Sequence, residues 1–200
     1  MAGKQILSTI FVGFVFFAAA VGHAATWDVD KVHSSVGFSV RHMMVSTVRG
    51  EFTSYQATAE FEPTDPSTLS VEATIDAASI STRNDARDKH LRSADFFDVE
   101  KFPQITFKST KAVRVAEGKY RITGDLTIHG VTKEITLEGE GFSNTIKDSR
   151  GNIRTGATAT ATISRKDFGL LWNAALEAGG VVVGDEVTID LEIELTQRAP

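Results

Sequence analysis

The 200-residue chain contains no cysteine. No disulfide framework is therefore available, and the hydrophobic core alone must hold the fold. The same absence excludes thiol catalysis, thiolate metal sites and covalent haem attachment. A chain of this length fits one domain that buries a sizeable core.

Basic residues are in the minority, with 21 Lys and Arg against 26 Asp and Glu and a net charge of −5 when His is neutral. Nucleic acids and anionic lipid surfaces attract positively charged proteins, so this balance argues against both as electrostatic partners. It does not argue against a lipid that is bound inside the fold.

Motifs for catalysis and for nucleotide binding are missing as well. The sequence has no Gly-x-Ser-x-Gly elbow, no GxGxxG, no Walker motif and no HExxH. No two histidines have the i, i+2 or i, i+4 spacing that presents a pair of imidazoles to a metal. We therefore expect no catalytic residues, no metal site and no enzyme activity.

Only one long apolar run occurs, from Ile6 to Ala20, and it follows the basic residue Lys4. Small residues at 22–24 then provide a cleavage site, so the pattern predicts a signal peptide over residues 1–24. A membrane anchor is the alternative, but the run is short for a span of about 20 residues. The prediction is a periplasmic protein with one domain at 25–200 and no stable membrane insertion after signal removal.

Alternating apolar and polar residues dominate the rest of the chain and indicate about eight antiparallel strands. Periodicity alone does not decide between a sandwich and a barrel. Long strands with internal glycines favour an all-β barrel, because glycine allows the wall to bend or a ligand to approach the backbone. These glycines are Gly37, Gly124, Gly139 and Gly141.

The densely charged segment from Arg83 to Asp98 departs from this pattern. Ser81 and Thr82 are suitable N-caps, so we expect a short helix from about Arg83 to about Ala94. Pro103 prevents the helix from continuing into the next strand. The expected docking side chains are Leu91, Phe96 and Phe97.

Small residues recur on the apolar strand faces. An eight-stranded barrel has an interior that is either filled by side chains or holds one small ligand. A filled core is one interpretation, and an apolar ligand cavity is the one that we favour. The positions that leave room are Ala57, Ala59, Ala73, Gly124, Ala157, Ala159 and Ala161.

Several motifs, in this order, resemble the YceI family of secreted, lipocalin-like, polyisoprenoid-binding proteins, and they cover nearly all of the chain after the signal. They are Asp30-Lys-Val-His-Ser-Ser-Val-Gly-Phe38 with Val40-Arg-His42, Gly50-Glu-Phe52, Arg87-Asp-Lys-His-Leu-Arg-Ser-Ala-Asp-Phe-Phe-Asp98, Phe102-Pro-Gln-Ile-Thr-Phe-Lys-Ser109, Gly124-Asp-Leu-Thr-Ile-His-Gly-Val-Thr132, Arg165-Lys-Asp-Phe-Gly169 and Gly184-Asp-Glu-Val-Thr-Ile189.

The resemblance implies an eight-stranded antiparallel lipocalin-like barrel with a helical insertion near one end. It also implies a long apolar tunnel for a non-covalently bound lipid, which is a polyisoprenoid, an isoprenoid quinone or a fatty-acid-like molecule. No catalytic residue and no cofactor follow from it. Homodimers are common in the family, and its members are mostly periplasmic or secreted.

Strand parity selects the side chains that we expect to contact the ligand, with Arg41 and His42 near its polar head group. Two alternatives remain: a periplasmic enzyme or redox partner that acts on a quinone-type ligand, and a ligand-free structural protein of the stress response. The predicted ligand-binding residues are Phe38, Val40, Arg41, His42, Phe52, Val71, Ile75, Phe107, Leu126 and Trp172.

Overall fold

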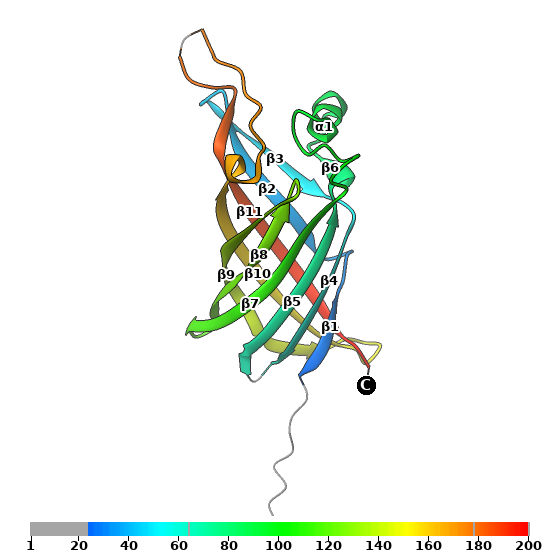
Figure 1. Cartoon of the computed structure of the whole chain (residues 1–200). Coiled ribbons are helices and arrows are strands. Elements are labelled where there is room, and N and C mark those ends of the chain that lie inside the picture. The colour runs from blue at the N-terminus through cyan, green and yellow to red at the C-terminus, as the bar shows by residue number, and fades with distance from the viewer. Residues whose placement is uncertain (1–23, 64, 178, 200) are drawn as a thin grey trace, which may run out of the picture.

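The computed structural model describes residues 24–63, 65–177 and 179–199. The predicted signal peptide, residues 1–24, therefore lies outside the described residues except for its last position. The described chain consists mainly of strands, with one short α-helix near one end of the sheet (Figure 1).

Eleven described strands form a single sheet in which every pair of neighbours is antiparallel. Two 3-10 turns and one helix, α1, interrupt them. The elements are β1 (Ala25–Val29), β2 (Ser35–His42), β3 (Ser46–Phe52), β4 (Tyr55–Glu62), β5 (Asp65–Asp76), η1 (Ala77–Ser79), β6 (Ile80–Ser81), α1 (Asp85–Arg92), β7 (Gln104–Ala116), β8 (Lys119–Ile128), β9 (Val131–Lys147), β10 (Ile153–Ser164), η2 (Arg165–Phe168) and β11 (Val183–Gln197).

Eight of these strands close into a barrel. In the order β1, β4, β5, β7, β8, β9, β10, β11, each strand pairs with the next, and β11 pairs again with β1. The expected eight-stranded antiparallel barrel is confirmed, and a sandwich is excluded because the sheet returns to its first strand. From β11 the sheet also continues through β2 and β3 to β6, at the end where α1 lies (Figure 1).

Strand β11 changes its partner along its length. It pairs with β2 from Val183 to Glu192 and with β1 from Leu195 to Gln197. At the change, the backbone N–H of Asp30 donates to the carbonyl of Glu194 at 2.8 Å, and the hydroxyl of Ser34 accepts the Glu194 N–H at 2.9 Å. The bend between β1 and β2 thus bonds the backbone groups of Glu194, which pair with neither β1 nor β2.

Arg154 of β10 fixes the same bend from outside. Its Nη1 donates to Asp30 Oδ2 at 2.6 Å and to Glu194 Oε1 at 2.5 Å, and its Nε donates to Asp148 Oδ2 at 2.9 Å. Hydrogen bonding, chiefly from Arg154, holds the pKa of Asp30 well below its usual range. Bonds from Asn152 and then from Arg154 lower the pKa of Asp148 in the same way.

Helix α1 is shorter at both ends than the predicted helix from Arg83 to Ala94. Its N-cap is Asn84, whose side chain accepts the backbone N–H of the third helical residue, so the predicted caps Ser81 and Thr82 are wrong. Arg83 has a left-handed φ of 61°, which turns the chain immediately before the cap. A helix that began earlier would require helical backbone angles at that residue.

Charged side chains fasten α1 to the chain that precedes it. Asp88 is 5% exposed, and its Oδ1 accepts the backbone N–H of Thr82 at 2.9 Å and the Thr82 hydroxyl at 2.5 Å. Arg87 donates to the Thr82 hydroxyl and carbonyl, and Arg92 donates to the carbonyls of Ala78 and Ile80. The charge of the segment therefore serves to attach the helix to the barrel.

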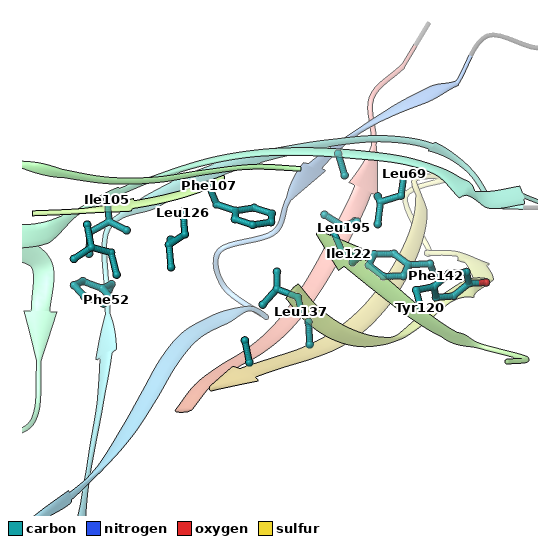
Figure 2. Close-up of a cluster of buried hydrophobic side chains, with 14 of the residues drawn as sticks. Phe52, Leu69, Ile105, Phe107, Tyr120, Ile122, Leu126, Leu137, Phe142 and Leu195 are labelled. Carbon is teal, nitrogen blue, oxygen red and sulfur yellow. The ribbon is translucent and has the colours of Figure 1, made fainter. Parts of the chain in front are cut away.

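The core runs along the barrel axis (Figure 2). At the end opposite α1, which we call the lower end, Phe142 lies edge-on to Phe61 and to Tyr120, with ring centroids 5.5 and 5.9 Å apart. Trp27 stacks on Phe61 at 5.1 Å and is fully buried. Aromatic rings therefore occupy the lower interior, while α1 lies over the upper end.

We predict that Asp88→Ala lowers the free energy of unfolding by about 2–3 kcal/mol, because it leaves buried donors of Thr82 without an acceptor. The control, Asp85→Ala, removes an exposed carboxylate from the same helix and should cost less than about 1 kcal/mol. Urea denaturation measures both. Equal losses in the two variants would contradict this role of Asp88.

We predict that stability falls as the pH is lowered from about 5 to about 2, since a depressed carboxyl pKa stabilises the fold above the unfolded pKa and is lost as the pH falls through the folded one. In Arg154→Met this fall should be shallower, because Asp30 and Asp148 lose the shared guanidinium. Arg121→Met, which removes an exposed pair with Glu138, is the control. Thermal melts across this pH range would show parallel slopes if Arg154 had no such effect.

Candidate ligand cavity

Two apolar cavities lie end to end inside the barrel. The lower one has a volume of about 150 Å³ and the upper one about 140 Å³. Val36, Ile75 and Ile189 line both, so the cavities meet at these three side chains. Side chains therefore do not fill the interior completely, and the favoured interpretation of an apolar cavity agrees with the structure.

The lower cavity exists because several facing positions carry alanine. Ala57 of β4 pairs directly with Ala73 of β5, and Ala159 of β10 lies between Gly139 of β9 and Leu191 of β11. A methyl side chain leaves space where leucine would fill the barrel. Of the small residues identified from the sequence, those that line this cavity are Ala57, Ala59, Ala73, Ala157 and Ala159.

Gly124 has a different role from the one expected. A Cβ at this position would lie 2.6 Å from the ring of Phe107, which itself lines the lower cavity. The glycine therefore makes room for an inward aromatic ring. Ala161, the remaining small residue, is buried but does not line either cavity.

The upper cavity is covered by the helical segment. Leu91 of α1 and the following Phe96 and Phe97 line it, opposite Phe38 and Phe52 from the sheet. The ring of Phe97 meets that of Phe52 edge-on at 5.9 Å. The expectation that these three side chains dock the segment onto the barrel is confirmed, and they form the upper wall of the cavity.

Seven of the ten predicted ligand-binding residues lie in the cavity walls. Parity placed them correctly because their strands keep an unbroken register over those positions. Their contact with a ligand stays a prediction. Phe38, Val40 and Phe52 line the upper cavity, Val71, Phe107 and Leu126 line the lower one, and Ile75 lines both.

The other three predicted residues lie elsewhere. Arg41 is exposed and donates to the Thr47 hydroxyl at 3.1 Å and to the Met44 carbonyl at 2.9 Å. His42 keeps the parity of Phe38 and Val40 in the unbroken pairing of β2 with β3, but it is the last residue of β2 and does not line either cavity. The structure therefore does not place Arg41 and His42 in the cavity wall, where a ligand head group was predicted to meet them.

Trp172 also lies outside the cavity walls. Its ring lies edge-on to His90 of α1 at 4.9 Å and tilted against Phe96 at 5.2 Å. His90 in turn bonds to Asp95 at 2.8 Å. Trp172 thus packs on the helical segment that covers the upper cavity, and not in the cavity wall where it was predicted.

Arg165 is a cavity residue that was known from the sequence only as part of a motif. It is 4% exposed, and its Nη1 donates to the carbonyls of Leu170 at 2.5 Å and Trp172 at 2.9 Å. Its Nε donates to the Gly184 carbonyl at 2.9 Å. Burial lowers the pKa of Arg165, and nearby Asp185 partly opposes this effect. The guanidinium therefore holds two segments together at the upper wall.

The cavities offer little polar chemistry. Arg165 is the only charged residue among their described linings, and its donors already meet carbonyl oxygens and a carboxylate. Among the described residues, every buried side-chain nitrogen or oxygen has a hydrogen-bond partner. A molecule in these cavities would therefore be held by apolar contact.

One group of described side chains has the atoms and spacing of a metal site. Ligand atoms of Asp30, His33 and Glu194 lie within 4.8 Å of one another. Arg154, however, donates to carboxylate oxygens of both Asp30 and Glu194. A guanidinium thus already supplies the positive charge that a metal ion would bring to this bend.

In the part of the chain that the structure describes, no helix has the length and apolar character needed to cross a membrane.

A family model for the YceI-like domain matches residues 27–195. The UPF0312 protein SAB2563 of Staphylococcus aureus (strain bovine RF122 / ET3-1) is 43% identical over 168 residues, which cover 84% of this chain and 95% of that protein. The UPF0312 protein SA2479 of strain N315 is 42% identical with the same coverage.

Solved structures share the fold. BcnA of Burkholderia cenocepacia matches with a TM-score of 0.72 and 25% identity, covering 84% of this chain and 99% of that one. The YCEI protein of Campylobacter jejuni matches with a TM-score of 0.69 and 32% identity over 85% and 96%. A polyisoprenoid binding domain from Saccharophagus degradans matches at 0.59 and 17% identity over 88% and 100%, a likeness of fold alone.

Proposed function

The chain belongs to the YceI-like domain family, and on that basis we propose that it is a non-catalytic protein that binds a long-chain apolar lipid inside its barrel. The observation that carries the proposal is the pair of adjoining cavities, which share Val36, Ile75 and Ile189. Burying each methylene group contributes about 0.8 kcal/mol, so a long chain binds tightly without polar contacts. The role is to sequester or transport that lipid.

The proposed ligand is a polyisoprenoid, an isoprenoid quinone or a fatty-acid-like molecule. Two cavities in line suit a slender chain, and their combined volume approaches the lower end of the about 300–1,000 Å³ found for small-molecule sites. The fold is shared with a domain named for polyisoprenoid binding. Polyprenyl lipids are therefore the first ligands to test.

Binding without catalysis is supported by the composition of the cavity walls. The one charged residue there, Arg165, already directs its donors to protein oxygens. His42 and His90, the groups on which a quinone-directed enzyme would depend, do not line the cavities. The described walls thus present no free acid, base or nucleophile to a bound chain.

The proposed location is the periplasm. It is supported by the apolar run from Ile6 to Ala20 and the small residues at 22–24, which are typical of a cleaved signal. N-terminal sequencing of the protein from a periplasmic extract tests this location. A first residue at Ala25 is the expected result, and recovery of the uncleaved chain with the membranes is the contrary one.

Native mass spectrometry of protein purified from its own host tests the function. We expect a co-purifying long-chain lipid, released on denaturation and identified by its mass. A protein that is free of ligand and also rejects polyprenyl lipids, quinones and fatty acids in titration would show that the cavities do not serve binding.

We predict that Ala159→Leu lowers the affinity for the lipid at least roughly tenfold, because the larger side chain displaces about two methylene groups of the ligand from the lower cavity. Stability should be unchanged or higher, since the new side chain enters existing space. Titration with a fluorescent polyprenyl lipid measures the affinity.

Thr162→Leu is the matched control for this prediction. It adds the same side chain to the same strand, but at an exposed position. It should leave the affinity unchanged. Equal losses in the two variants would assign the effect to the strand as a whole, and equal affinity of Ala159→Leu and the wild type would remove the lower cavity from the binding site.

A further inference from the structure

Two loops project from the barrel at the end where α1 lies (Figure 1). One is the turn between β2 and β3, residues 43–45. The other follows η2 and folds back on itself, with a bridge between Ala175 and Val181. The backbone N–H of Met43 donates to the carbonyl of Val182 at 2.8 Å, so the two loops lie side by side.

Large apolar side chains at this end face solvent. The exposed fractions are 42% for Met43, 63% for Met44, 79% for Val45 and 66% for Leu171. Met43 and Met44 have left-handed φ values of 50° and 62°, a conformation that residues other than glycine adopt only at a cost. We call the consecutive residues Met43, Met44 and Val45 the apolar tip.

The sequence around the apolar tip carries little charge, although the guanidinium of the exposed Arg41 donates to the Met44 carbonyl at 2.9 Å. Residues 42–48 include no Asp, Glu, Lys or Arg, and residues 168–184 include only Glu177. Other exposed apolar side chains have charged neighbours in sequence: Lys31 precedes Val32, Arg114 lies between Val113 and Val115, and Lys147 follows Ile146. Single exposed apolar residues are ordinary on a protein surface, whereas a group without charge marks an interaction site.

The apolar tip adjoins the rim of the upper cavity. Val40 and Val183 line that cavity, and Val183 pairs with His42, the residue before Met43. The apolar tip thus begins one residue after His42, whose pairing partner Val183 lines the upper cavity. The upper cavity is therefore the one that adjoins the apolar tip.

We propose that the apolar tip inserts into the surface of a phospholipid bilayer, so that the upper cavity exchanges lipid with the membrane. The inference rests on the proposed function, because the bilayer is the reservoir of such a ligand. A second copy of this chain is the weaker occupant: a stable protein interface needs about 800 Å² per partner, and three partly exposed side chains provide far less.

The charge pattern defines the kind of membrane contact. No Lys or Arg lies within residues 42–48 or 168–184, and the whole chain has a net charge of −5. The exposed Arg41 lies beside this surface, because its guanidinium donates to the Met44 carbonyl, so one cation accompanies a contact that is made mainly by apolar side chains. Insertion into neutral phosphatidylcholine vesicles is expected, with little change between low and high salt.

The absence of cysteine permits a local test in the full chain. An environment-sensitive dye is attached to Val45→Cys at the apolar tip or to Val115→Cys at the lower end, where the native side chain is 47% exposed. With phosphatidylcholine vesicles, the dye at position 45 should shift to the blue and be quenched by brominated lipid. The dye at position 115 should do neither. Because the readout is local, lipid contact by another part of the chain does not produce it.

Three results would overturn the proposal. They are no response at position 45, equal responses at both positions, and a shift at position 45 that grows with protein concentration without vesicles. The last would identify a second copy as the occupant. None of these readouts needs a ligand, so failure of insertion and failure of lipid binding are distinguishable.

A matched pair of aspartate variants connects insertion with exchange. Val45→Asp should slow transfer of a polyprenyl lipid from the loaded protein to vesicles roughly tenfold, because an apolar contact with the bilayer is lost. Val115→Asp should transfer at the wild-type rate. Both should retain the lipid in native mass spectra, since neither residue lines the two cavities inside the barrel. Equal transfer rates in the two variants would contradict a role for the apolar tip in exchange.

Discussion

The fold depends on one strand that must pair with two partners. Strand β11 leaves β2 after Glu192 and meets β1 at Leu195, and the hydrogen bonds between these points come from the bend at Asp30 and Ser34. Without them, backbone groups where β11 closes the described barrel would have no partner. Arg154 reinforces the bend with three carboxylates, so a cluster of ionic contacts lies where the ladder of backbone bonds is interrupted.

This closure leaves an interior whose two ends differ. Aromatic rings occupy the lower end, where Phe142 contacts both Phe61 and Tyr120. The upper end is covered by a helix that is held by polar bonds to its own preceding segment and by apolar contacts to the rest of the barrel. Between the ends, alanines on β4, β5 and β10 prevent the core from filling. The closed barrel and its incompletely packed core together produce the cavities.

The sequence predicts the barrel well because alternation is a local property. Along β11, apolar residues at every second position line the cavities in the order in which they occur, up to Leu195. Prediction fails where alternation does not say how far the cavities extend: His42 keeps the parity of Val40, yet it lines neither cavity. Asn84 was missed as a cap because the turn at Arg83 is a tertiary feature. Arg165 was missed because its acceptors are backbone carbonyls, which no side-chain pattern reveals.

The ring of Phe142 has a consequence for selectivity. It is part of the lower cavity wall and is supported from behind by Phe61 and Tyr120, both nearly fully buried. The proposed lipid, if it entered beneath α1 and extended downward, would meet this ring at the bottom of the lower cavity. Each carbon added up to that point would contribute to binding, and every further carbon would stay outside the upper rim. The proposed function therefore implies selection by chain length more than by head-group chemistry.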